Sequence, residues 1–267
     1  QFNYYNKYNR FIDRIRKVQK QEPRLMNYKI KNFNLYKKWN SIINELSSKI
    51  DGPIKDDIGW SCSIKSVQML LSYYFKKWNM EKYIIELIYK EGGSLSVHSF
   101  IRKCIKCNCK ERAGDYFGVH TVLQIYKKLL YEQNIFNPMT YIDEPEYKAV
   151  HITTDNIIDI DKINRNKQTI LIYSTRLGIN KLNSFYKEMI LNLFKCQHFD
   201  GMLGGVGKSC YYFIAKHTHF ENLIYLDPHN VQSKINIDNC FPNIRDLLSY
   251  HCLKPNEINI NKIDPSL

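Results

Sequence analysis

The stretch Gly-Trp-Ser-Cys at residues 59–62, followed by a long apolar run to Phe75, constrains the fold more than any other part of the sequence. No proline or glycine interrupts residues 62–75, and Ser61 is a good N-cap, so we expect a helix that begins near Cys62. Its apolar side chains extend around most of the helix instead of forming one stripe. A helix of this kind is buried, so the pattern predicts a central helix that other elements cover.

Cys62 would lie in the first turn of this helix, and two interpretations of it are open. The unsatisfied N–H groups and the positive end of the helix dipole favour a thiolate there, which would suit a nucleophile. Free cysteine is also common in protein cores, where it serves only as a small apolar side chain.

The rest of the chain indicates helices first and an antiparallel sheet afterwards. Residues 118–134 and 182–196 have helical periodicity, and residues 169–175 are typical of a buried strand. Residues 209–217 and 222–227 are apolar runs around a short polar turn, which predicts a hairpin. The glycines at 202–208 indicate a flexible loop before it. This order predicts an α+β chain and not a βαβ chain.

A cysteine nucleophile needs a base, and Asp227-Pro228-His229 at the end of the hairpin offers one. Residues i and i+2 of an extended chain point to the same side, so Asp227 would orient the His229 imidazole. The alternative is an ordinary β-turn, because Asp-Pro-His-Asn is a favourable turn sequence. His217 and His219 compete as bases, but no carboxylate stands at a comparable spacing from them.

The formal net charge of +13 permits two interpretations. It suits nucleic-acid binding, but the basic residues are scattered and no nucleic-acid module is recognisable. We favour a compositional bias toward Lys, Asn, Ile and Tyr, with weak attraction to acidic partners or membrane surfaces. No apolar run approaches the roughly 20 residues that span a bilayer, and the N-terminal residues lack the apolar segment of a signal peptide. We therefore expect a cytoplasmic protein.

The eight cysteines form no regular framework and are expected to be reduced thiols. Cys104, Cys107 and Cys109 could hold zinc with His98 as the fourth ligand. The sequence lacks a second Cys-x-x-Cys pair, so we expect no metal and no cofactor.

Six segments along the chain can be compared as a set. They are GWSC (59–62) followed by SVQMLL, YFGVHTVLQIYKKL (116–129), VHITTDN (150–156), TRLGINKLNSFY (175–186), GGVGKSCYYFIA (204–215) and LIYLDPHNVQ (223–232). These segments resemble the autophagy-related protein 4 (autophagin) family of cysteine proteases. They occur in the family's order, and the resemblance covers roughly residues 36–235.

The resemblance implies a papain-like cysteine protease fold of the α+β class. The helix that carries the nucleophile would pack on an antiparallel sheet. We expect a single catalytic domain over residues 1–267, with a small extra helical lobe inserted at about 78–135. The implied activity is cleavage after the C-terminal glycine of an autophagy ubiquitin-like modifier. Both precursor processing and release of the modifier from phosphatidylethanolamine are expected of the family.

The resemblance also implies roles for individual residues. Cys62 matches the nucleophile, and Asp227 and His229 match the Asp-Pro-His pair. The family's helper tyrosine corresponds to Tyr36, with Tyr28 as its rival.

Substrate gating is assigned from the same resemblance. Tyr116 stands where the family usually has a tryptophan that covers the active site. Tyr116 would close a tunnel together with the loop that contains Gly204, Gly205 and Gly207. Such a tunnel would admit a glycine tail without side chains.

The expected partners follow from the same resemblance. They are the modifier, both as free precursor and conjugated to lipid, and transiently the autophagosomal membrane surface. We expect a monomer that binds no nucleic acid. Two alternatives remain open: a peptidase for another modifier, of the ubiquitin-fold modifier type, or an inactive module that binds the modifier.

Overall fold

A computed structural model describes part of the chain, and the account below is confined to that part. The described residues are 59–78, 80, 83, 87, 93–133, 149–153, 169–207, 209–217, 220–229 and 256–264. Tyr28, Tyr36 and His219 lie outside them.

The first half of the described chain contains three helices, α3 (Cys62–Lys77), α5 (Val97–Lys106) and α6 (Val119–Glu132). Two short strands follow, β1 (Ala149–Thr153) and β2 (Thr169–Tyr173), and then helix α7 (Ser184–Leu193). The chain continues with β3 (Met202–Val206), β4 (Ser209–Lys216), β5 (Asn222–Leu226), β6 (Asn256–Asn259) and the 3₁₀ turn η2 (Ile260–Lys262). The predicted helices, the strand at 169–175 and the hairpin are confirmed within a few residues.

The main sheet has the strand order β3-β4-β5-β6, and every neighbouring pair in it is antiparallel. This confirms an α+β chain built on an antiparallel sheet. A separate pair, β1 and β2, is parallel, which the predicted topology did not include. Helices α5 and α6 lie in the segment 78–135, and their division from the rest as an extra lobe stays a prediction.

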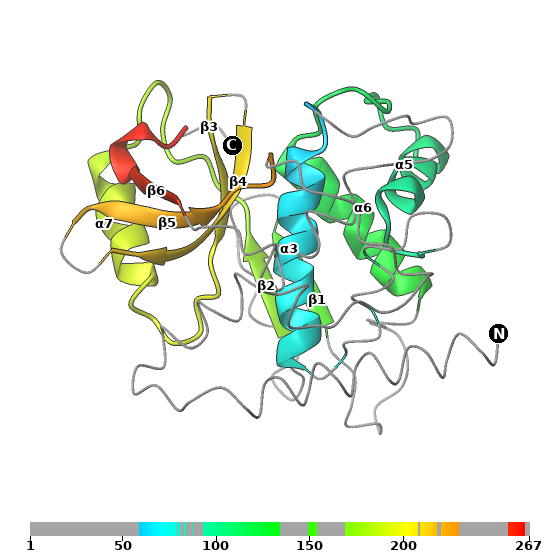
Figure 1. The fold of residues 1–267 in the computed structure, drawn as a ribbon, viewed down its shortest axis with the longest axis horizontal. Coiled ribbons are helices and arrows are strands. Elements are labelled where there is room, and N and C mark those ends of the chain that lie inside the picture. The colour runs from blue at the N-terminus through cyan, green and yellow to red at the C-terminus, as the bar shows by residue number, and fades with distance from the viewer. Residues whose placement is uncertain are drawn as a thin grey trace, which may run out of the picture.

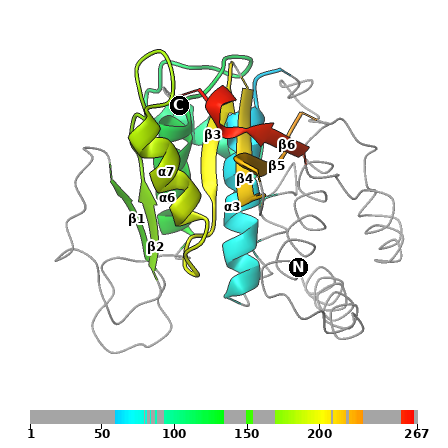
Figure 2. The same ribbon diagram turned by 90° about the vertical axis from the view of Figure 1, so that its left-hand side faces the viewer.

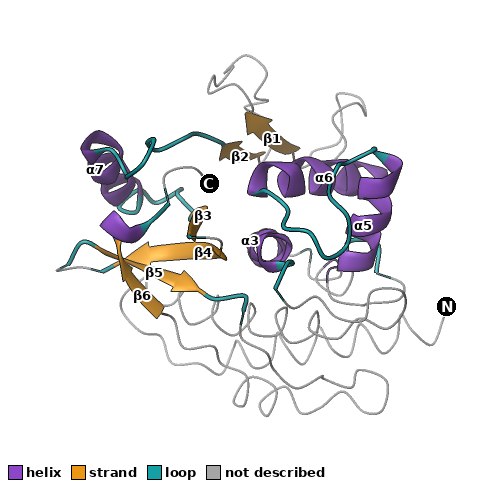
Figure 3. Ribbon diagram, turned by 90° about the horizontal axis from the view of Figure 1, so that it is seen from above, coloured by secondary structure: helices purple, strands orange, loops and turns teal. Residues whose placement is uncertain are grey.

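Helix α3 is the centre of the molecule, as its sequence predicts. In Figure 3 it is seen nearly end-on, between β4 on one side and α5 and α6 on the other. Figure 1 shows the same order from the front. Ile64, Val67 and Phe75 have no exposed surface, and neither do the small polar residues Ser63 and Ser66. The helix is therefore covered on several sides, and burial of its apolar surface is its main source of stability.

The strand β4 separates two apolar cores because neighbouring side chains of a strand point to opposite faces. Tyr212 belongs to the core that contains α3, α5 and α6. Phe213 belongs to a second core, which includes Ile190 of α7 and Ile260 of η2. Helix α7 thus covers the face of the sheet opposite α3, and Figure 2 views the molecule from this side.

The prediction of a flexible glycine loop at 202–208 is wrong for residues 202–206. These residues form β3, in which Gly204 pairs with Tyr211 and Gly205 pairs with Cys210. The turn itself is confined to the end of the strand, where Gly207 has a φ of 64°. The glycines are compatible with a strand here because the backbone hydrogen bonds to β4 hold the strand in place, and these bonds do not require side chains.

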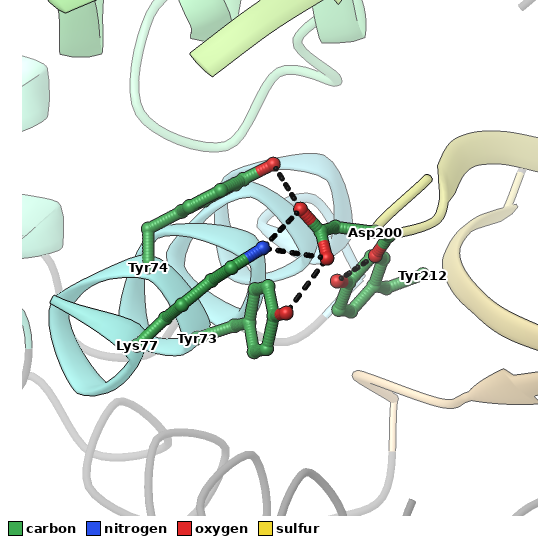
Figure 4. A network of polar contacts seen from close by, with 5 residues as sticks. All are labelled: Tyr73, Tyr74, Lys77, Asp200 and Tyr212. Carbon is green, nitrogen blue, oxygen red and sulfur yellow. Dashed lines mark hydrogen bonds and ion pairs between the residues drawn. The ribbon is translucent and has the colours of Figure 1, made fainter. Parts of the chain in front are cut away.

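A carboxylate fixes the end of α3 that is distant from Cys62 (Figure 4). Asp200, just before β3, accepts hydrogen bonds from the hydroxyls of Tyr73 at 2.6 Å and Tyr74 at 3.0 Å. Lys77 Nζ lies 2.9 Å from the same carboxylate. The hydroxyl of Tyr212 in β4 donates to the Asp200 carbonyl at 2.7 Å. One residue therefore joins the last turn of the central helix to the sheet.

We expect Asp200→Ala to lower the free energy of unfolding by about 2–4 kcal/mol, because the buried phenol of Tyr74 and the partly buried phenol of Tyr73 lose a charged acceptor. Lys77→Ala serves as the matched control, since its side chain is 39% exposed and exposed ion pairs contribute below about 1 kcal/mol. Urea denaturation of both variants measures the difference. Equal losses in the two variants would contradict this assignment of the stabilisation to the phenols of Tyr73 and Tyr74.

Candidate active site

Cys62 is the first residue of α3, at the end of the helix where N–H groups lack partners inside the helix. The carbonyl of Ser61 accepts from the Lys65 N–H at 2.9 Å, so the helical bonding begins at the expected residue. Cys62 is 6% exposed. Ser66, one turn further along the helix, donates to the Cys210 carbonyl at 3.4 Å. The face of α3 that carries Ser66 thus packs against β4.

Asp227 and His229 follow β5, and their side chains meet as the spacing predicts. Asp227 Oδ1 lies 2.7 Å from His229 Nδ1 and also accepts from the His229 backbone N–H at 2.9 Å. The second bond is that of an Asx turn, closed by an aspartate side chain on the backbone two residues later. The turn and the Asp–His pair, considered as alternatives from the sequence, are therefore one structure.

The three residues Cys62, Asp227 and His229 are connected in the structure. The His229 ring is bonded to Asp227 and also lies near enough to the Cys62 side chain that the two residues shift each other's pKa. Since Nδ1 faces Asp227, the other ring nitrogen is the one left for Cys62. Residues 165 positions apart in the chain thus form a continuous Cys–His–Asp series.

The surroundings of Cys62 favour its ionised form. Burial raises the pKa of the thiol, but hydrogen bonds from His229 and from the backbone N–H groups of Cys210 and Ser63 oppose this, as does the charge of His229. The sum of these effects holds the pKa of Cys62 below its ordinary value. The backbone donors matter because they stabilise a thiolate without carrying a titratable group.

The pKa values of His229 and Asp227 also shift in the directions that favour their charged forms. The hydrogen bonds with Asp227 and Cys62 raise the pKa of His229 to about 9. Burial raises the pKa of Asp227, but the hydrogen bonds from the His229 ring and backbone outweigh it and hold that pKa below its ordinary value. A thiolate beside an imidazolium that a carboxylate orients is chemically suited to attack an acyl carbon and protonate the leaving group.

Tyr116 is 37% exposed and precedes the buried Phe117. Burial and the nearby charges of Cys210, Cys62 and Asp264 raise the pKa of its hydroxyl, so the hydroxyl lies within electrostatic range of Cys62. Gly204 and Gly205 are buried in β3, and the Gly205 carbonyl accepts from the Asp264 N–H at 2.9 Å. The predicted gating residues are thus near one another, although the glycines are in a strand and not in a loop.

Within the described residues, neither His217 as a base nor the cysteines at 104–109 as zinc ligands has a geometry comparable to that of Cys62, His229 and Asp227. The ring of His217 packs against Phe220 at 4.8 Å between centroids, at the far end of the hairpin from Asp227. Across the described ranges, no group of three or more His, Cys, Asp or Glu side chains is arranged to hold a metal ion, including the cysteines at 104–109.

Two residues at the site were missed by sequence reasoning, Cys210 and Tyr211 of β4. The backbone of Cys210 donates to Cys62, and the Tyr211 ring packs against the His229 ring at 5.4 Å between centroids. Tyr211 also contacts the ring of Tyr225, at 4.6 Å. Their positions in the hairpin were predicted, but their proximity to Cys62 and His229 depends on how α3 and β5 flank β4.

Comparison with known proteins agrees with this geometry. A family profile described as the peptidase C54 catalytic domain matches residues 16–267, which is most of the chain. The chain belongs to the peptidase C54 family. This confirms the family resemblance, and with it membership in a family of papain-like cysteine peptidases.

Individual relatives carry names from the same family. The cysteine protease ATG4 of Candida albicans is 30% identical over 224 residues, which cover 79% of this chain and 47% of that protein. The probable cysteine protease ATG4 of Kluyveromyces lactis is 27% identical over 254 residues, covering 88% of this chain and 54% of that protein. Cysteine protease ATG4A of the mouse is 27% identical over 265 residues, with coverages of 81% and 63%. The chain spans about half the length of the curated relatives it matches.

We expect Asp227→Asn to lower the pKa of His229 from about 9 toward its ordinary value, because the imidazolium loses its anionic acceptor. A raised histidine pKa stabilises the fold fully below the unfolded value of about 6.5, and this stabilisation is lost as the pH rises through the folded value. The variant should therefore lose stability near neutral pH and differ little from the parent above pH of about 10. An NMR titration of the His229 ring measures the shift, and an unchanged pKa would leave Asp227 as a turn residue only.

Proposed function

We propose that this chain is a cysteine endopeptidase that cleaves after the C-terminal glycine of autophagy-related protein 8, a ubiquitin-like modifier. The series Cys62–His229–Asp227 at the N-terminus of a buried helix is the observation that carries the proposal. Family membership and the names of the relatives support the substrate class. Both precursor processing and release of the modifier from phosphatidylethanolamine belong to the proposal, because the two reactions break the same glycine carbonyl bond.

The mechanism assigns one task to each residue. The Cys62 thiolate attacks the carbonyl carbon of the terminal glycine, and the Cys62 N–H with the Tyr36 hydroxyl holds the oxyanion. His229 then protonates the leaving amine, which is that of a peptide or of the lipid headgroup. Water hydrolyses the resulting thioester, with His229 as base and Asp227 holding the ring in position. Tyr36 enters through the family resemblance alone.

A tunnel beside β3 would explain selectivity for glycine. Gly205 pairs with Cys210 and would leave the wall next to it free of a side chain, whereas Gly204 faces Phe213 of the second core. Tyr116 would cover the approach to Cys62. A tail without side chains fits between them, whereas larger residues would contact the ring of Tyr116.

The positive charge of the chain, +13, would favour transient contact with an anionic membrane surface. We propose a cytoplasmic monomer without nucleic-acid partners. Over the described part of the chain, no helix combines the length and the apolar character needed to cross a membrane.

The direct test uses the modifier with a C-terminal extension, and separately the modifier attached to phosphatidylethanolamine in vesicles. We expect cleavage after the glycine in both substrates, read by mass spectrometry. Cleavage of a ubiquitin-fold modifier precursor instead would support the alternative peptidase. Binding of the modifier without cleavage or labelling by an electrophilic modifier probe would support the inactive module.

We expect Cys62→Ala to reduce hydrolysis by at least about a thousandfold, because no other group supplies the nucleophile. Binding of the extended modifier should persist, since the substitution removes one buried sulfur and leaves the tunnel walls in place. Turnover assays and calorimetric titration of the same preparation separate the two effects. Substantial turnover by the purified variant would defeat the assignment of Cys62.

We expect Tyr116→Ala to speed alkylation of Cys62 by iodoacetamide several-fold, because the ring no longer covers the thiol. Tyr116→Phe is the matched control: it keeps the ring and removes the hydroxyl, so its rate should stay near that of the parent. An alanine variant no faster than the parent would show that Cys62 is open already or is covered by another group.

A further inference from the structure

The end of helix α5 has a geometry that brings two of its three nearby cysteines together. The Cys109 N–H donates to the Cys104 carbonyl at 3.0 Å, and the Asn108 N–H donates to the Ile105 carbonyl at 3.1 Å. Asn108 has a φ of 55°, in the left-handed region. These features define a Schellman motif, in which the chain folds back over the last turn of the helix.

The motif brings the side chains of Cys104 and Cys109 close to each other. They occupy the two positions of a Schellman motif whose side chains commonly contact each other. Cys104 is 1% exposed and belongs to the core around α3, and Cys109 packs against this core while partly exposed. The Cys109 thiol is near enough to Cys104 to raise the pKa of the Cys104 thiol. The backbone bond between the same two residues keeps their Cα atoms close, as a disulfide requires.

Cys107 has a different environment although it lies in the same turn. It caps α5, and the Lys128 ammonium of α6 donates to its sulfur at 3.4 Å. Its N–H also donates to the Cys104 carbonyl, at 3.2 Å. Cys107 thus has a polar partner on a second helix, which makes it a suitable internal control for Cys109.

We propose that Cys104 and Cys109 are a redox-active dithiol that closes to an intramolecular disulfide by exchange with a small disulfide such as glutathione disulfide. The Cys109 thiolate attacks one sulfur of glutathione disulfide and expels one glutathione thiolate. The Cys104 thiolate then attacks the Cys109 sulfur and expels the second glutathione. Two cysteine thiols are oxidised and one glutathione disulfide is reduced, and the two protons of the cysteine thiols pass through water to the two expelled glutathione thiolates.

The order of these two steps follows from exposure. Cys109 is the accessible thiol, so it meets the reagent first. Burial and the nearby Cys109 raise the pKa of Cys104, so it supplies little thiolate and resolves the mixed disulfide slowly. Closure would be slow but would not require the helix to unfold. The site is separate from Cys62, so this inference stands whether or not the proposed function does.

A closed disulfide would fasten the start of the segment that leads to Tyr116 and Phe117. The Arg112 side chain donates to the carbonyls of Lys110 and Glu111, and the Arg112 backbone N–H donates to the Asp115 carboxylate at 2.7 Å. Phe117 packs on Phe100 of α5 with 5.1 Å between ring centroids. The dithiol therefore lies at one end of a bonded segment whose other end adjoins the active-site candidates.

The test incubates the folded full chain with glutathione disulfide and compares the parent with Cys109→Ser and Cys107→Ser. Remaining thiols are then alkylated and the protein is digested with trypsin. Cleavage after Lys103, Lys106 and Lys110 places Cys104 in one peptide and both Cys107 and Cys109 in the next. A cross-link therefore appears as a joined pair of peptides that has lost two hydrogens. Circular dichroism before and after treatment verifies that the helices persist.

We expect the joined pair in the parent and in Cys107→Ser, where Cys109 alone can be the partner. Cys109→Ser should leave Cys104 as a free thiol, and reduced glutathione should reopen the disulfide in the other two proteins. A cross-link that persists in Cys109→Ser would assign the pair to Cys104 and Cys107 and overturn the proposal. A stable glutathione adduct on Cys109 in the parent, or no reaction there, would overturn it as well.

Discussion

The contact between the N-terminal turn of α3 and strand β4 is the constraint on which the rest of the site depends. Ser66 donates to the Cys210 carbonyl, and the Cys210 N–H donates to Cys62, so the backbone of one residue of β4 contacts the first two turns of the helix. At the other end of α3, Asp200 bonds Tyr73 and Tyr74, and its carbonyl accepts from Tyr212 of β4. The helix is thus fixed to the sheet near both ends, and Cys62 has little freedom to move away from His229.

The electrostatics of Cys62 result from two opposed effects of that packing. Burial disfavours a thiolate, whereas the backbone donors and His229 favour it and prevail. The imidazole is held in turn by Asp227, through an Asx turn that fixes the backbone of His229 as well as its ring, and by contact with the Tyr211 ring. A site of this kind needs no large movement to form its ion pair, because each donor belongs to a helix, a strand or a closed turn.

Local patterns in the sequence predicted the central helix, the hairpin and the Asp227–His229 pairing, because each depends on residues a few positions apart. Strand β3 was missed because its glycines indicate mobility, whereas its order comes from pairing with Cys210 and Tyr211. Strand β6 has the polar sequence Asn-Glu-Ile-Asn, which lacks the apolar alternation of a typical strand, and pairs with β5 through its backbone. Tyr211 and Asp200 could not be assigned, since their roles depend on elements far apart in the chain.

The central claim is that His229 and the packed helix terminus hold the pKa of Cys62 below its ordinary value. The ultraviolet absorbance of the thiolate, followed as a function of pH, measures this most directly, with a Cys62→Ala sample subtracted to remove the other thiols. The account predicts that the parent Cys62 ionises below the ordinary cysteine pKa and that His229→Ala moves this ionisation well above it, since burial then acts with weaker opposition. Identical titration curves for the parent and His229→Ala would contradict the account.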